Sequence, residues 1–148
     1  MTVRLVGPPR RRDAPRFDRA LLRARARDVL RALGQGDSEL SVSLVDDDAM
    51  ARLNGEWRGR ERPTDVLSFS LLEGAHARHR GGLLGDVVIG LWVAARQARA
   101  GGRSLDEELC RLLIHGVLHL LGHDHEVAAE ARRMRAEERR LRREVEPA

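Results

Sequence analysis

The 148-residue chain contains a single cysteine, no tyrosine and no lysine. Cys110 has no second thiol with which to form an intrachain disulfide, as is usual in a reducing compartment. No apolar run approaches the roughly 18 residues that span a bilayer, and no apolar signal segment follows the basic start of the chain. These absences predict a cytoplasmic protein with no membrane partner.

Aromatic residues are also scarce, because the chain has only two Phe and two Trp. They are too few for the stacking platforms with which RNA-recognition sheets read single-stranded bases. Arginine is abundant instead: 27 basic residues, all of them Arg, face 23 acidic ones, which gives a net charge of +4. Guanidinium groups bind phosphate well, but a GC-rich genome also replaces Lys with Arg throughout. The charge is therefore compatible with an RNA partner held by its backbone, without establishing one.

The length is that of about one average domain, and we expect residues 1–148 to form a single domain. Apolar periodicity predicts an α+β fold, in which a small mixed β-sheet packs against helices around a central buried helix. The strands are expected at residues 3–6, 39–45, 66–71 and 84–91; the helices at 17–33, just after 46–48, at 92–100, at 104–121 and from about 126; and loops at 10–16, 55–63 and 74–82.

The helix expected at 104–121 carries the most chemical information. Ser104 and Glu107 form a capping-box pattern at its start, and residues 112–121 are almost all apolar, which predicts burial on most faces. His115 and His119 interrupt this run four residues apart, so that they lie on the same face one turn apart. Gly122 suits a left-handed turn that ends the helix and lets His125 return towards the pair.

The resulting spacing, H-x-x-x-H-x-x-G-x-x-H, predicts a zinc site. His115, His119 and His125 would hold one Zn²⁺ ion and leave the fourth position to water, as in catalytic zinc sites. His123 has the wrong register for a ligand, and His76 and His79 fall in a polar loop.

The residue after the first histidine argues against proteolysis. Metalloproteases with this spacing carry Glu there as the general base, whereas this chain has Gly116. The base would then be the metal-bound hydroxide itself or a carboxylate from another segment, for which the candidates are Asp124, Asp86 and Asp65. Asp124 could instead orient one of the ligating imidazoles.

The segment from His115 to His125, HGVLHLLGHDH, resembles the signature of the YbeY family of bacterial metal-dependent endoribonucleases, the rRNA maturation factors. Asn54 to Phe69 resembles that family's N-x-x-Y-R-G and P-T-D-V-L-S-F segments, and Leu84 to Val88 its L-G-D-I segment. Trp57 stands in place of the usual Tyr, so that the aromatic ring is kept and the hydroxyl lost.

The resemblance implies a zincin-like arrangement and a zinc-dependent endonuclease specific for single-stranded RNA. It implies a role in 16S rRNA 3′-end maturation and ribosome quality control, with the small ribosomal subunit as partner, and with a ribosomal protein or a ribosome-associated GTPase as a further one. Arg58 matches the family's functional arginine, and a guanidinium near the metal could bind a phosphate and offset the charge of the transition state.

Two other interpretations stay open at the level of sequence. A zinc metallopeptidase would share the histidine spacing, and cleavage of casein would reveal it. A non-catalytic ribosome-associated factor would hold a purely structural metal, closed by a fourth protein ligand. The charged C-terminal helix, with its narrow apolar stripe of Val127, Ala131, Met134, Leu141 and Val145, either packs on its own domain or serves as a docking surface.

Overall fold

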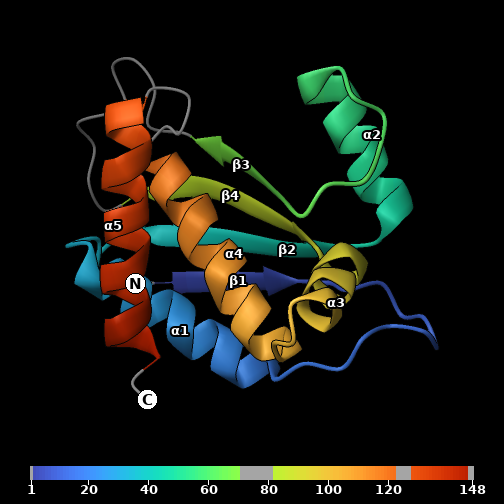
Figure 1. Ribbon diagram of the computed structural model, residues 1–148, viewed down its shortest axis with the longest axis horizontal. Coiled ribbons are helices and arrows are strands. Elements are labelled where there is room, and N and C mark those ends of the chain that lie inside the picture. Colours follow the sequence, from blue (N-terminus) through green and yellow to red (C-terminus); the bar gives the residue numbers. More distant parts are fainter. Residues whose placement is uncertain (1, 71–81, 123–127, 147–148) are drawn as a thin grey trace.

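The computed structural model describes residues 2–70, 82–122 and 128–146 (Figure 1). The elements in chain order are β1 (Thr2–Val6), α1 (Arg19–Ala32), β2 (Glu39–Val45), α2 (Asp47–Arg58), β3 (Val66–Ser70), β4 (Leu83–Gly90), α3 (Leu91–Ala100), α4 (Leu105–Leu120) and α5 (Ala128–Val145). Strands and helices combine in one α+β arrangement, which confirms the predicted fold class. None of the described helices is long and apolar enough to cross a membrane.

The four strands form a mixed sheet in the order β1-β2-β4-β3. β1, β2 and β4 run parallel, whereas β3 pairs with β4 in the antiparallel direction. Residues 3–6 thus form a strand, as the sequence predicts, and this strand lies at one edge of the sheet. The other edge is β3, which residues 59–65 connect to the end of α2, where Arg58 lies.

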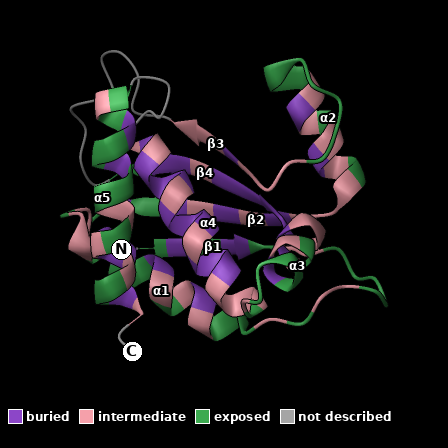
Figure 2. Ribbon diagram, viewed as in Figure 1, coloured by how far each residue is buried: buried purple, intermediate pink, exposed green. Residues whose placement is uncertain are grey.

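The core lies between the sheet and the helices α1, α4 and α5, which cross the same face in Figure 1. Leu40, Val42 and Leu44 alternate into this core from β2, as the period-two pattern predicts. Buried residues concentrate on the strands and along α4 (Figure 2), so α4 is the central helix of the fold. A smaller apolar cluster of Met50, Leu67 and Val88 occupies the opposite face of the sheet, beneath α2.

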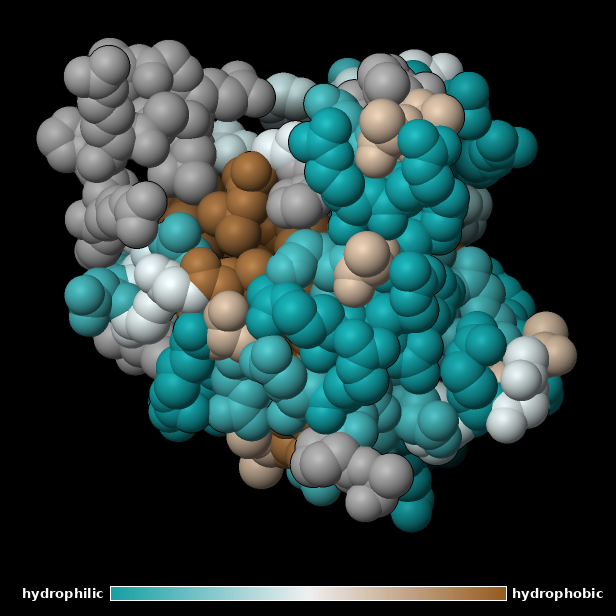
Figure 3. Space-filling model, turned by 60° about the vertical axis from the view of Figure 1, so that its left-hand side comes forward, coloured by the Kyte–Doolittle hydropathy of each residue, from teal (hydrophilic) through white to brown (hydrophobic). Residues whose placement is uncertain are grey.

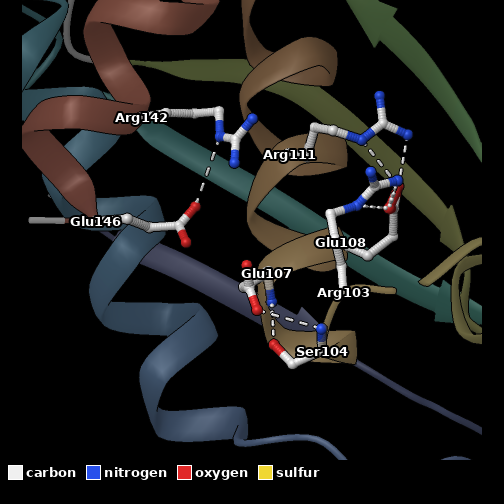
Figure 4. Close-up of polar contacts among 7 residues, drawn as sticks. All are labelled: Arg103, Ser104, Glu107, Glu108, Arg111, Arg142 and Glu146. Carbon is white, nitrogen blue, oxygen red and sulfur yellow. Dashed lines mark hydrogen bonds and ion pairs between the residues drawn. The ribbon is translucent and has the colours of Figure 1, made fainter. Parts of the chain in front are cut away.

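The first turns of α4 are fixed by polar contacts (Figure 4). The Ser104 side chain accepts a hydrogen bond from the Glu107 backbone while the Glu107 side chain accepts one from the Ser104 backbone, so the predicted capping box is confirmed. Glu108 is fully buried and binds two guanidinium groups, with its Oε2 at 2.6 Å from Arg103 and its Oε1 at 2.9 Å from Arg111. Burial alone would raise the pKa of Glu108, but the hydrogen bonds from Arg111 and Arg103 outweigh it and hold that pKa below its ordinary value.

The C-terminal helix α5 packs its apolar stripe on its own domain. Ala131, Met134, Leu141 and Val145 are all buried, and Val127 lies outside the described residues. The remaining positions of α5 are mainly charged, and the side of the molecule on which α5 lies is mostly hydrophilic (Figure 3). Packing on the domain is therefore the correct one of the two interpretations of this stripe.

Candidate active site

Two predicted metal ligands meet on the exposed side of α4. The Nε2 atoms of His115 and His119 lie 3.1 Å apart, and the two rings are inclined by 67°. Two nitrogens that bind one tetrahedral zinc ion at 2.0 to 2.1 Å are about 3.3 Å apart. The pair therefore has the separation that a shared metal ion requires, and its chemistry fits zinc.

The third predicted ligand, His125, lies outside the described residues, as do His123, Asp124, His76 and His79. Within residues 2–70, 82–122 and 128–146, no three potential ligands gather at one point. Gly122 has a φ of 93°, which confirms the predicted left-handed residue just beyond α4. The three-histidine set itself stays a prediction, with two members placed in the structure.

Cys110 also lies on α4, but it is not a candidate ligand. Burial raises the pKa of its thiol to about 12, and the neighbouring Glu146 adds to this shift. A thiol with this pKa is protonated at neutral pH and is neither a nucleophile nor a thiolate ligand. The candidate chemistry therefore belongs to the histidine face.

That face opens into a cleft of about 540 Å³. Strand β3 with the two residues before it forms one wall, and the end of α2 forms another; the lining residues are Trp57, Arg58, Thr64, Asp65, Val66, Leu67, Ser68, Phe69, Ser70, His115 and His119. Trp57 is 66% exposed and meets Phe69 edge to face, with ring centroids 5.4 Å apart. The cleft thus combines two imidazoles, a guanidinium and an aromatic surface.

Arg58 reaches this cleft from the end of a helix. The sequence predicts a loop over residues 55–63, and this is wrong for 55–58, because α2 continues to Arg58. The helix stops at Gly59 instead, whose φ of 69° is a left-handed conformation and whose N–H bonds to the carbonyls of Asn54 and Gly55. The residue predicted to be functional is therefore on a rigid element.

Two serines of β3 tie the sheet to the histidine helix. Ser68 Oγ donates to the carbonyl of Gly116 at 2.9 Å, and Ser70 Oγ donates to the carbonyl of Leu120 at 3.1 Å. Both acceptors lie in the turns that carry His115 and His119. Sequence reasoning missed these serines, although their alternation in the pattern V-L-S-F-S places them on one face of the strand.

Gly116 is a glycine because α4 approaches the sheet closely. A Cβ at this position would lie 2.7 Å from Val87 Cγ1 and 3.2 Å from Ser68 Oγ. No Glu side chain fits there without displacing the helix from the sheet. Close packing of α4 on the sheet therefore explains why this position does not carry the glutamate base of a metalloprotease.

Substitution of Gly116 by Ala is expected to destabilise the fold by about 1 to 3 kcal/mol, because the overpacking outweighs a gain of about 1 kcal/mol in helix propensity. Urea denaturation measures this change. Gly36→Ala is the control, because a Cβ there has no neighbour within 4 Å. A Gly116→Ala protein as stable as the parent would show that the helix does not approach β4 so closely.

Two of the carboxylates predicted as bases are placed by the structure. Asp65 lines the cleft, and its Oδ1 accepts a hydrogen bond from the Val66 backbone at 2.8 Å. Asp86 pairs across the sheet with Phe69, which packs in the cluster on the face opposite α4. Asp86 therefore lies on the face opposite α4, and Asp65 is the described candidate that lines the cleft.

An unpredicted carboxylate contacts the histidine pair from α5. Glu138 Oε2 lies 3.6 Å from His115 Nδ1, and the other nitrogen of that ring faces His119. A carboxylate behind a ligating imidazole fixes its orientation and raises its basicity. The sequence offers Asp124 as one candidate for this task and does not single out Glu138, because nothing in the charged pattern of α5 distinguishes Glu138 from its neighbours.

Glu138→Gln is expected to weaken zinc binding about 10-fold, because the amide orients the imidazole without the charge that makes it a better ligand. Competition with a chromophoric chelator measures the zinc Kd. Glu144→Gln on the same helix is the matched control, since Glu144 pairs with Arg140 instead. Equal zinc affinity in the Glu138 and Glu144 variants would remove this role.

Fold and site together define a class of protein: a small α+β chain whose buried helix presents two imidazoles, spaced for one metal ion, to a cleft that contains an arginine. Comparison with known proteins identifies the family to which the chain belongs. Residues 11–146 match the family described as Endoribonuclease YbeY. The chain belongs to the YbeY family of endoribonucleases, which confirms the resemblance of its motifs.

Several relatives carry the name Endoribonuclease YbeY. The protein of Anaeromyxobacter sp. (strain Fw109-5) is 52% identical over 97% of this chain and 71% of its own length. That of Anaeromyxobacter dehalogenans is 54% identical over 82% of this chain and 62% of its length, and that of Geobacter metallireducens 48% identical over 81% of each. The solution structure of TM1509 from Thermotoga maritima is similar to this fold, with a TM-score of 0.65 and 28% identity over 97% of this chain and 88% of that one.

Proposed function

We propose that this protein is a zinc-dependent endoribonuclease that cleaves single-stranded RNA. One observation carries the proposal: in a chain of the YbeY family, a histidine pair with the separation of zinc ligands shares a cleft with Arg58. An imidazole pair for a metal and a guanidinium for a phosphate are the two groups that phosphodiester hydrolysis needs most.

His115 and His119 would hold the zinc ion together with His125. When bound, zinc supplies Lewis acidity, which polarises a phosphoryl oxygen and lowers the pKa of water towards about 7. Arg58 binds the non-bridging oxygens of the scissile phosphate and stabilises the negative charge that grows on them in the transition state. Asp65 lines the cleft and is oriented by the Val66 N–H, and it would accept a proton there.

The aromatic pair supports a single-stranded substrate. An unstacked base can lie against the exposed ring of Trp57, and such a contact contributes about 1 to 3 kcal/mol per base. A base in a duplex is stacked and paired, so that its face is not available to the ring. This explains how Trp57 can replace the family's usual Tyr, since stacking needs the ring and not the hydroxyl.

The biological part of the proposal follows the family. We propose maturation of the 16S rRNA 3′ end and ribosome quality control in the cytoplasm, on the small ribosomal subunit and with a ribosomal protein or ribosome-associated GTPase as a further partner.

The test uses the purified chain with end-labelled RNA. Zinc-loaded protein is expected to cleave a single strand and to leave a duplex of the same sequence intact; EDTA should stop cleavage and added zinc should restore it. Casein is the control substrate. Chelator-sensitive cleavage of casein would favour the peptidase, and a zinc-loaded protein that cleaves neither substrate would favour the non-catalytic factor.

A further inference from the structure

A second pocket, of about 440 Å³, adjoins the cleft. Arg58, Thr64 and Asp65 line both hollows, so these three residues form the boundary between them. The second pocket adds residues from α2, from the segment that follows it and from α3: Asn54, Arg60, Arg62, Pro63, Val93 and Gln97. Arg60 and Arg62 therefore join Arg58 around one cavity.

The segment 59–63 is held in place by a buried amide. Asn54 is only 3% exposed, and its side-chain Nδ2 donates to the carbonyl of Arg62 at 2.9 Å, while its backbone carbonyl accepts from the Arg60 N–H at 3.3 Å. The left-handed Gly59 sets the direction in which the segment leaves α2. These hydrogen bonds thus fix the backbone positions from which the Arg60 and Arg62 side chains extend.

Successive side chains of this segment point to different sides, which separates its acidic residue from its basic ones. The side chain of Glu61 packs over Gly55 and lines a different hollow together with Arg52 and Glu56. Arg60 and Arg62 both line the pocket next to the cleft. The acidic residue of the segment is thereby kept away from the basic ones.

The three guanidinium groups of this pocket have no ion-pair partner among the residues that the structure describes. Arg103 and Arg111 bind the buried Glu108, but Arg58, Arg60 and Arg62 are exposed and form no ion pair with any residue in the described ranges. Asp65 is the one carboxylate of the pocket lining, and its Oδ1 is bonded to the Val66 N–H. The pocket therefore carries net positive charge directly beside the proposed catalytic cleft.

We propose that this pocket binds the phosphate one nucleotide away from the scissile phosphate on a single RNA strand. The inference rests on the proposed function and adds the path of the bound RNA across the protein. The strand passes from the histidines over Arg58 to Arg60 and Arg62. Asn54 Oδ1 and Gln97 Oε1 are buried acceptors that find no donor among the described residues. A nucleotide brings N–H and O–H donors as well as the anion, which suits this lining better than inorganic phosphate alone.

The first test measures binding without cleavage. A fluorescent single-stranded 12-mer is titrated with protein in EDTA at several salt concentrations, and its anisotropy is followed. The Arg60→Gln/Arg62→Gln double variant is expected to bind about 10-fold more weakly, and its log–log salt dependence should be shallower by about 0.7, the value for one phosphate on a single strand. Arg4→Gln/Arg27→Gln is the control, because it removes the same charge from exposed arginines of β1 and α1 that form no ion pair within the described ranges.

The second test separates this inference from the proposed function. With zinc-loaded protein, the Arg60→Gln/Arg62→Gln variant should raise KM for a trinucleotide about 10-fold and leave the cleavage of a dinucleotide, which has only one phosphodiester, unchanged. If both double variants changed the RNA affinity and its salt dependence equally, the proposed subsite would be wrong. Cleavage of RNA by the parent protein would still support the proposed function in that case. Failure of the parent to cleave any RNA would refute the function itself, and the salt slope would then decide the subsite alone.

Discussion

Substitution of His119 by Ala is expected to abolish zinc binding and RNA cleavage together. The Nε2 atoms of His119 and His115 lie 3.1 Å apart, the separation of two ligands on one ion, so the loss of either leaves an incomplete donor set. Zinc content should fall from about one ion per chain to near none after dialysis. Cleavage of single-stranded RNA should fall by at least on the order of 10³-fold. Elemental analysis and a gel assay on the same preparation measure the two quantities.

The variant should remain folded, because His119 is half-buried at the cleft and is not one of the buried residues that form the hydrophobic core. A melting temperature within a few degrees of the parent establishes this. Arg99→Ala is a suitable control, since Arg99 is exposed on α3 and lines neither the histidine cleft nor the pocket beside it. A His119→Ala protein that keeps full cleavage in EDTA would rule out the metal mechanism.

Much of the fold could be predicted from local patterns. The alternation Leu40, Val42, Leu44 identifies β2, and the capping box with the apolar run after it identifies α4. The spacing of His115 and His119 places both imidazoles on one face, because helical geometry is fixed by the chain itself. Such features need no knowledge of what packs against them.

The rest depended on contacts between distant segments. From the sequence, Gly116 indicated only that the general base of a metalloprotease is missing. Its closeness to Val87 and Ser68 arises from the packing of α4 on two strands and cannot be read from the sequence. Glu138 meets His115 only because α5 packs along α4. No spacing in the sequence encodes either distance, so one sequence alone could not provide them.

The sequence predicts the role of Arg58 but places the end of its helix, α2, too early. Gly55 resembles a helix stop, but it lies inside α2 because Glu61 covers it and Gly59 supplies the left-handed cap. The consequence is functional: a guanidinium at the end of a packed helix starts from a fixed backbone position, which a long loop would not give it. Preorganised charge of this kind stabilises a transition state at little reorganisation cost.

Arg58→Ala is therefore expected to lower kcat for RNA cleavage by about 10² to 10³-fold while zinc content stays at the parent level. The guanidinium acts on the charge that grows on the phosphate, so its loss should affect kcat more than binding of the uncleaved strand. Single-turnover cleavage with saturating zinc-loaded protein measures the chemical step.

Lysine at this position tests geometry against charge. Arg58→Lys keeps the positive charge but cannot form the bidentate contact, so it should recover only part of the lost rate. Arg52→Ala, on the same helix but lining the hollow beside Glu56, is the matched control and should cleave like the parent. If Arg58→Ala lost zinc in proportion to its activity, Arg58 would support the metal site and not the phosphate, and the division of roles between α2 and α4 would be wrong.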